Sequence, residues 1–131
     1  MIFVDSNIPM YVVGQSHPNK VRVLEIVPRL LREGERLVID AEVLQEILHR
    51  YVAIDRRMAI DPCFRALLAL VDTVFPIELP HLVRAKDLVR EHAALSARDA
   101  LHLAVMEDQG ITRFLTFDRG FERVGGLQVL R

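Results

Sequence analysis

Short apolar runs alternate with longer segments of helical periodicity along nearly the whole chain, and this alternation restricts the possible folds more than any other feature. The apolar runs predict strands at Met1–Val4, Leu37–Ile39, Val74–Leu79, Arg113–Thr116 and Leu127–Leu130. Pro76 within the third run indicates an edge strand, because proline cannot donate to a neighbour. Strands that alternate with helices pair in parallel. The sequence therefore predicts a three-layer α/β/α sandwich with a mainly parallel central sheet.

Helices are predicted between these runs. A short one begins near Pro9 with Asn7 as its N-cap, and a long one runs from Pro18 to about Arg32. Pro28 should kink or break the long helix, since an internal proline removes a backbone donor. Further helices follow Asp40 as N-cap, start near Pro62 and carry Leu67 to Val71, span Pro80–His92, and run from Ser96 to Gly110. The last of these is apolar nearly all round, so we expect it deep in the protein.

The composition narrows the class of protein. A length of 131 residues fits a single domain spanning residues 1–131. No apolar segment is long enough for a membrane helix, and Met1–Asp5 has no basic region typical of a signal peptide. Cys63 is the only cysteine and cannot form an intramolecular disulfide, so we expect a cytoplasmic protein. The chain has no glycine-rich phosphate loop, which argues against P-loop and Rossmann nucleotide binding.

Acidic residues follow the predicted strands or begin the helices beside them. Asp5 directly follows the first strand, and Asp118 lies just beyond the fourth. Glu46 lies on the helix after the second strand, and Asp99 lies in the first turn of the apolar helix. Parallel sheets bind ligands outside the carboxyl ends of their strands, so this fold can bring the four acids into one cleft.

Carboxylates that gather in this way need a cation to offset their repulsion. Oxygen ligands without a nearby thiol select Mg²⁺ or Mn²⁺ over zinc. One or two such ions can activate water and offset the charge on a phosphoryl group, so the pattern indicates phosphodiester hydrolysis.

Each acid also has an ordinary structural interpretation. Asp5 can end a strand and cap a helix, Asp99 can be half of a capping box with Ser96, and Asp118 can be a turn residue. Glu46 can be a solvated helix residue, and Glu42 competes for its role one turn earlier. The separate explanations do not account for the edge that all four share.

Four segments resemble the motifs of PIN-domain nucleases, in family order and over essentially the whole chain. They are Ile2-Phe3-Val4-Asp5-Ser6-Asn7-Ile8, Val43-Leu44-Gln45-Glu46-Ile47-Leu48, Leu95-Ser96-Ala97-Arg98-Asp99-Ala100-Leu101-His102-Leu103-Ala104 and Leu115-Thr116-Phe117-Asp118-Arg119-Gly120-Phe121. The third is the most specific. Within the family, the chain is most similar to the VapC-type toxins of toxin–antitoxin pairs, which are small stand-alone PIN domains.

This resemblance implies the roles of several residues. By this resemblance, the ligands of a bound Mg²⁺ or Mn²⁺ would be Asp5, Glu46, Asp99 and Asp118. Asn7 and Thr116 would be supporting polar groups. The resemblance further implies endoribonuclease activity, a homodimer and inhibition by a small cognate antitoxin. One departure is Asp40, where relatives often carry Ser or Thr; like Glu42, it adds an acid whose part in the site the sequence leaves open.

Three other interpretations compete with this one. Glu46-x-x-His49 and Asp99-x-x-His102 have the acid-x-x-His spacing of di-iron sites in helical bundles, although packing or hydrogen bonding beside the cleft fits these histidines better. Asp5 could be an aspartyl nucleophile in phosphoryl transfer, but Asn7 stands where such enzymes usually carry a second acid. The chain could also be a catalytically inactive PIN-like module that binds RNA or a partner.

Basic residues give a weaker signal, since the net charge is −1. Arg98 and Arg119 adjoin two of the proposed ligands and are candidates for contacts with substrate phosphates. Any RNA contact must therefore use a local basic patch or bound cations.

Overall fold

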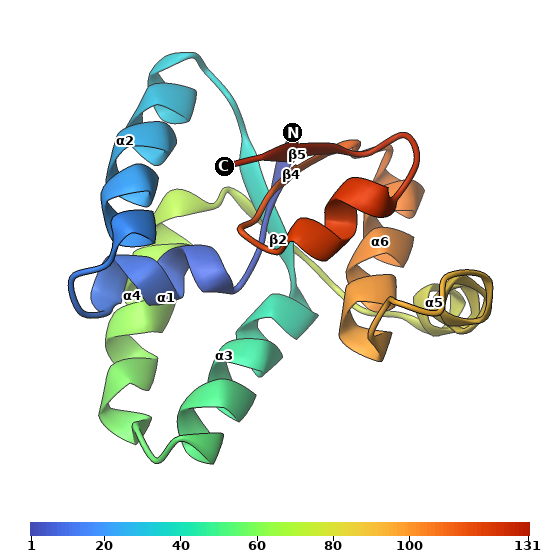
Figure 1. Cartoon of the computed structure of the whole chain (residues 1–131), viewed down its shortest axis with the longest axis horizontal. Helices are drawn as coiled ribbons and strands as arrows, with labels where there is room; N and C mark the ends of the chain where they lie inside the picture. Colours follow the sequence, from blue (N-terminus) through green and yellow to red (C-terminus); the bar gives the residue numbers. More distant parts are fainter.

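A parallel sheet runs through the middle of the molecule in the computed structural model, which describes all 131 residues (Figure 1). Its strands are β1 (Ile2–Val4), β2 (Leu37–Asp40), β3 (Thr73–Phe75), β4 (Arg113–Leu115) and β5 (Gln128–Leu130). They lie in the order β3-β2-β1-β4-β5, and every neighbouring pair is parallel. The prediction of a mainly parallel sheet is confirmed. The edge position of β3 is confirmed as well, but the predicted strand Val74–Leu79 was too long: β3 ends at Phe75, before Pro76, and Leu79 already begins the next helix.

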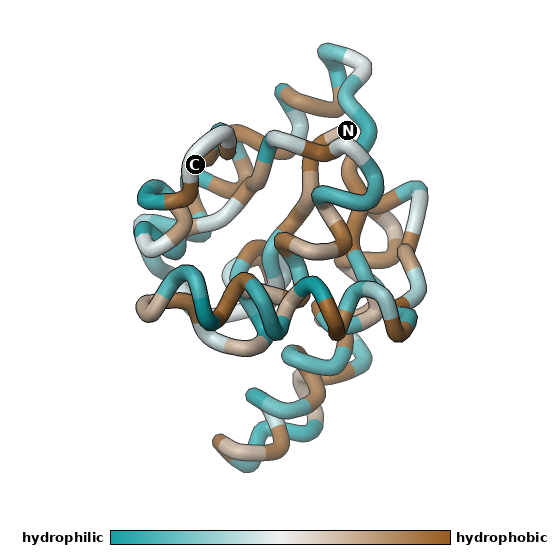
Figure 2. The backbone as a smooth tube through the Cα atoms, turned by 90° about the vertical axis from the view of Figure 1, so that its right-hand side faces the viewer, coloured by the Kyte–Doolittle hydropathy of each residue, from teal (hydrophilic) through white to brown (hydrophobic).

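Helices cover both faces of this sheet. They are α1 (Asn7–Val13), α2 (Pro18–Arg32), α3 (Ala41–Ala53), α4 (Ile60–Leu70), α5 (Leu79–Glu91) and α6 (Ala97–Gln109), with short 3₁₀ turns η1 (Arg57–Ala59) and η2 (Arg119–Arg123). Figure 1 shows α1, α2 and α4 on one side and α5 and α6 on the other, which confirms the three-layer sandwich. Hydrophobic and hydrophilic residues alternate along the helices (Figure 2), as expected where one side of each is buried.

Helix α6 lies deep in the protein, as predicted from its sequence. Every residue from Ala100 to Met106 is buried, because the helix packs closely against α5 as well as the core. The hydroxyl of Ser96 accepts a hydrogen bond from the Asp99 amide at 3.1 Å and caps its start. Gly110 ends it in the left-handed conformation, with φ of +67°. These caps hold the first turn of α6 in place at the carboxyl edge of the sheet.

Three predictions about the helices were also wrong. Pro28 lies inside a continuous α2, because the helical bond that it cannot make would go to the carbonyl of Leu24, and both residues are exposed, so water can hydrate that carbonyl. Asn7 is the first residue of α1 and not its cap; its amide turns toward Asp5 instead. Helix α4 begins at Ile60, earlier than Pro62, and Val71 is already extended.

The order of the strands places a crevice at the ends of β1 and β4. From β1 the chain adds β2 and then β3 on one side, and β4 and then β5 on the other side. The strand order therefore reverses at β1. The Asp5 amide donates a hydrogen bond to the Leu115 carbonyl at 3.0 Å, which ties the two strand ends together. Open parallel sheets bind ligands at such a point. None of the helices is both long and apolar enough to cross a lipid bilayer.

Candidate functional site

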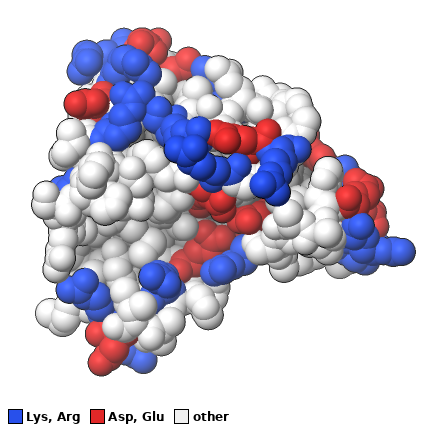
Figure 3. All heavy atoms as spheres, in the orientation of Figure 1, with Lys and Arg blue, Asp and Glu red and all other residues white.

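A pocket of 560 Å³ opens at this crevice, and most of the residues that line it are polar or charged. Its residues are Asp5, Ser6, Asn7, Met10, Tyr11, Glu46, Arg50, Ser96, Arg98, Asp99 and Asp118. The four predicted acids are all among them, although they come from four separate parts of the fold: the ends of β1 and β4 and the helices α3 and α6. Figure 3 shows acidic side chains gathered near the centre of this face, with basic ones beside them.

Asp5 accepts more hydrogen bonds than any other acid of the pocket, and they reach both of its oxygens. The Thr116 hydroxyl donates to Oδ2 at 2.6 Å, and the Ser6 amide donates to Oδ1 at 2.7 Å. The side chain is only 7% exposed. Burial raises the pKa of Asp5 to about 6, although the hydrogen bond from Thr116 acts in the opposite direction. A negative charge at Asp5 is therefore costly unless a cation faces it.

Asn7 and Thr116 form a small polar network behind Asp5. The buried Thr116 hydroxyl gives its proton to Asp5, so it can only accept from the Asn7 side chain, which lies 3.4 Å away. This sets the orientation of the amide, with Nδ2 toward Asp5 and Thr116. The other amide atom, Oδ1 of Asn7, is then buried without a hydrogen-bond partner. An unpaired buried acceptor of this kind is well suited to bind a cation or a water held by one.

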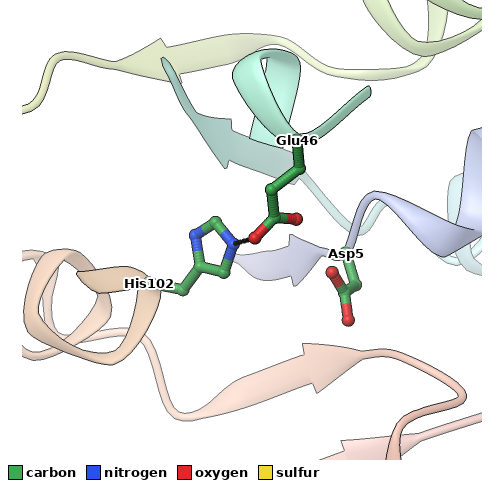
Figure 4. A group of neighbouring side chains, drawn as sticks. All are labelled: Asp5, Glu46 and His102. Carbon is green, nitrogen blue, oxygen red and sulfur yellow. Dashed lines mark hydrogen bonds and ion pairs between the residues drawn. The ribbon is translucent and has the colours of Figure 1, made fainter. Parts of the chain in front are cut away.

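A buried group made by Asp40, His102 and Glu46 adjoins the pocket, and of the three only Glu46 lines it. His102 Nδ1 lies 2.8 Å from Asp40 Oδ2, and Nε2 lies 2.9 Å from Glu46 Oε1 (Figure 4). Burial opposes a charge on the ring, but the two carboxylates outweigh it and raise the pKa of His102 well above 6.5. Burial likewise raises the pKa of Glu46, and the hydrogen bond and charge of His102 more than reverse this. The group is thus an imidazolium that donates to two carboxylates.

This arrangement decides which of these side chains can bind a metal. Ligand atoms of Asp5, Glu46 and His102 lie within 4.8 Å of one another. Both ring nitrogens of His102 donate hydrogen bonds, however, so neither has a lone pair for a metal. Asp5 and Glu46 remain as the buried oxygen ligands.

Asp99 and Asp118 lie nearer the mouth of the pocket. Asp99 is half-buried, and burial raises its pKa, with further contributions from the charges of Asp118 and Glu46. Asp118 is exposed, and its Oδ1 accepts a hydrogen bond from the Gly120 amide at 2.8 Å. The carboxylates thus repel one another across the pocket.

Several residues singled out from the sequence lie outside the pocket. Asp40 is the N-cap of α3, as predicted, and both of its oxygens are engaged, one by the Val43 amide and one by His102. Glu42 does not line the pocket; burial and the charge of Glu46 raise its pKa. Arg119 lines a neighbouring pocket, whereas Arg98 lines the acidic one.

The paired acid-x-x-His interpretation is wrong. His49 is exposed and takes no part in the pocket, and His102 is held by carboxylates. The preference for hydrogen bonding beside the cleft is confirmed for His102.

Sequence reasoning did not place Arg50 or Tyr11 in the pocket; for Tyr11, packing in the core or an interface was preferred to stacking on bases. Arg50 follows Glu46 by four residues, which places both on one face of α3. Tyr11 follows Asn7 by the same interval on α1. A spacing of four residues in a helix from a proposed site residue was the signal that would have identified both.

Comparison with known proteins gives the family. The model of the PIN domain matches residues 2–127. The chain belongs to the PIN-domain family. It is 55% identical over 130 residues to Ribonuclease VapC13 of Mycobacterium tuberculosis, covering 99% of each chain, and to a VapC ribonuclease of Mycobacterium bovis over the same span. Ribonuclease VapC23 of M. tuberculosis is 40% identical over 118 residues, covering 90% of this chain and 93% of its own. The resemblance to VapC-type PIN proteins is thus confirmed.

Solved structures share the fold of this PIN domain at low sequence identity. The toxin VapC20 of M. tuberculosis, which cleaves the sarcin–ricin loop, aligns with a TM-score of 0.73 and 20% identity over 95% of both chains. VapBC2 of Rickettsia felis, bound to a DNA fragment from its promoter, aligns with a TM-score of 0.71 and 16% identity, covering 99% of this chain and 98% of the other. A toxin–antitoxin complex from Klebsiella pneumoniae aligns with a TM-score of 0.66 at 16% identity, covering 100% and 97%.

Proposed function

We propose that this PIN domain, residues 1–131, is a divalent-metal-dependent endoribonuclease that acts as the toxin of a toxin–antitoxin pair. One observation carries the proposal: four carboxylates from distant parts of the chain line a single pocket at the point where the strand order reverses. The ribonuclease names of relatives at 55% and 40% identity support it.

The residues of the pocket fit a hard divalent cation. Asp5 and Glu46 would hold it most closely, with Asp99 and Asp118 completing an all-oxygen set that suits Mg²⁺ or Mn²⁺. The unpaired Oδ1 of Asn7 is a further acceptor at the same place. Such an ion, when bound, acidifies water and offsets the negative charge of a phosphoryl group.

Other side chains of the site fix the carboxylates and can contact the substrate. Thr116 and Asn7 fix the carboxylate of Asp5, and His102 fixes that of Glu46, so neither has to reorganise when a phosphate enters. Arg98 and Arg50 line the same pocket and can donate to phosphate oxygens that the carboxylates would otherwise repel.

We also propose that a small antitoxin inhibits the protein, by analogy with the toxin–antitoxin complex among its structural relatives. The homodimer stays a prediction. The exposed apolar residues Leu79, Leu82 and Val83 of α5 are available for a contact between two copies of the chain.

The decisive experiment is cleavage of a mixed RNA pool, with structured tRNA and rRNA, by the purified antitoxin-free protein in Mg²⁺, Mn²⁺ or EDTA. We expect metal-dependent cutting that Asp5→Asn reduces by more than about hundredfold, beyond what changes outside the ligand set usually cause. Asp61→Asn, which removes an exposed carboxylate of α4 away from the pocket, should cut like the wild type. Absence of cutting by folded, metal-supplied protein would favour the inactive RNA- or partner-binding module instead.

A further inference from the structure

A second pocket, of 360 Å³, is lined by three arginines and no acid. Its residues are Asn19, Arg22, Phe117, Arg119 and Arg131. The proposed nuclease mechanism gives this second pocket no role. Arginine is the residue best suited to hold phosphate groups, since its planar guanidinium can donate two parallel hydrogen bonds.

These arginines are only partly neutralised. Arg119 is exposed and forms no ion pair, whereas Arg22 lies 3.7 Å from Glu25 and Arg131 pairs with Glu122. Nη1 of Arg131 is buried without a hydrogen-bond partner. The Arg22 side chain also donates a hydrogen bond to the backbone oxygen of Arg131 at 2.9 Å, which holds Arg22 beside the last strand. The pocket therefore keeps unused donors and an excess of positive charge.

The two pockets adjoin along the segment after β4. Asp118 lines the acidic pocket, and its neighbours Phe117 and Arg119 line the arginine pocket. Figure 3 shows a band of Lys and Arg side chains that crosses this face toward the central acidic cluster. A chain of phosphates that has one group in the acidic pocket can therefore continue into the arginine pocket.

Aromatic rings lie between the two pockets. Tyr11, which lines the acidic pocket, contacts the edge of Phe117 with ring centroids 5.4 Å apart. The ring of the exposed residue His17 also packs against Tyr11, with ring centroids 4.9 Å apart and an interplanar angle of 35°. Aromatic rings beside a basic groove are the usual means of binding single-stranded nucleic acid, because bases stack on the rings while cations hold the backbone.

We propose that this arginine pocket, together with the Tyr11–His17–Phe117 cluster, binds the single-stranded RNA that flanks the cleavage site. A base next to the scissile phosphate stacks on the aromatic cluster, and a neighbouring phosphate enters the arginine pocket. The aromatic rings favour RNA over an acidic peptide, which would use only the arginines. The inference rests on the proposed function, since it names how the same substrate extends beyond the acidic pocket.

The test measures binding and not cleavage. Asp5→Asn protein in EDTA is titrated with a fluorescently labelled, mixed-sequence single-stranded RNA at several salt concentrations. Adding Arg119→Gln should weaken binding about fourfold at 0.15 M salt and lower the slope of log affinity against log salt by about 0.7, the value for one lost phosphate contact on a single strand. Arg22→Gln should act in the same direction, and Tyr11→Leu should weaken binding without changing the slope.

Arg90→Gln is the matched control, since Arg90 is exposed and unpaired on α5; both of its values should match those of the parent. Arg119 has no folded-state partner, so its variant should unfold like the parent in a thermal melt. Unchanged affinity and slope in the Arg119 and Arg22 variants would overturn the proposal, as would an equal loss in Arg90→Gln. The same proteins are also titrated with a polyglutamate peptide. If the Arg119 and Arg22 variants lose binding to this peptide but bind RNA like the parent, the pocket would belong to a protein partner instead. Because no cleavage is measured, an enzyme that proved inactive would leave this result unaffected.

Discussion

His102 illustrates at the scale of single residues how one side chain can determine the charge of two others. It is fully buried between Asp40 and Glu46, which are themselves buried. Two carboxylates this close to each other in the interior would repel, and the imidazolium between them removes that cost. The same bonds aim Glu46 at the pocket. Removing the ring should therefore affect stability more strongly than removing an ordinary core histidine.

We expect His102→Leu to lower the free energy of unfolding by about 3–5 kcal/mol near pH 5.5, because it leaves buried charges uncompensated. The pKa of His102 is raised above 6.5, so its contribution is full below pH 6.5 and falls as the pH rises through the folded value. The pKa of Glu46 is lowered below 4.5, so its contribution is full above pH 4.5 and falls in stronger acid.

Urea unfolding at pH 5.5 and at pH 9 measures the contribution of His102, and a third series at about pH 3.5 measures that of Glu46. His81→Leu is the matched control: His81 is also buried and lies 2.9 Å from Asp108, but that carboxylate is exposed and can be solvated. An equal loss of stability for the two histidine variants would contradict the special role of His102.

At the scale of elements, α6 connects the core to the site. Its buried residues anchor it, and its first turn carries Asp99 and then His102 three positions later, on one face. The ends of this helix are set by Ser96 and Gly110. Ser96 caps the end that carries the functional side chains, whereas Gly110 stabilises the far end of the helix.

Gly110→Ala should lower the free energy of unfolding by about 1–2 kcal/mol, because alanine tolerates a φ of +67° poorly. An added Cβ meets nothing within 4 Å, so the cost comes from the backbone conformation alone. Gly125→Ala is the control, since it has the same free space without a positive φ, and it should be neutral or slightly stabilising. Thermal melts of the two variants should differ clearly; similar melting temperatures would show that Gly110 is not under this constraint.

At the scale of the whole molecule, folding itself brings together carboxylates that would stay apart in the unfolded chain. The pKa of Asp5 rises from 3.8 to about 6, so this group stabilises the metal-free fold only in acid and costs stability as the pH rises through about 6. By the usual conversion, this cost is about 2–3 kcal/mol at neutral pH. A bound cation removes it.

We therefore expect Mg²⁺ to raise the melting temperature more at pH 8 than at pH 5, where a proton already occupies Asp5. Asp5→Asn should melt higher than the wild type in EDTA at pH 8 and respond less to Mg²⁺. Differential scanning fluorimetry with an ion titration measures both. A shift that is equal at the two pH values and equal in the variant would place the ion elsewhere.

The features that depended on neighbouring residues could be predicted from the sequence. Periodicity and side-chain chemistry within a few positions predict four of the five strands, the caps Asp40, Ser96 and Gly110, and the burial of α6. The end of β3 was the exception, because the apolar run continues past Phe75. The order of helices and strands also implied a parallel sheet, and hence which acids follow strands at one edge. The PIN-domain motifs have the same local character.

Only the tertiary structure decided what depends on distant contacts. Asp40 and His102 are 62 positions apart, so no local pattern could show that they share a hydrogen bond or that burial raises the pKa of Asp5. Pro28 stays helical because its side of α2 faces water. Arg98 and Arg119 look alike beside their acids, yet one lines the acidic pocket and the other the arginine pocket. Sequence determines the local conformation through nearby atoms, whereas charge and burial depend on which surfaces the order of the strands brings together.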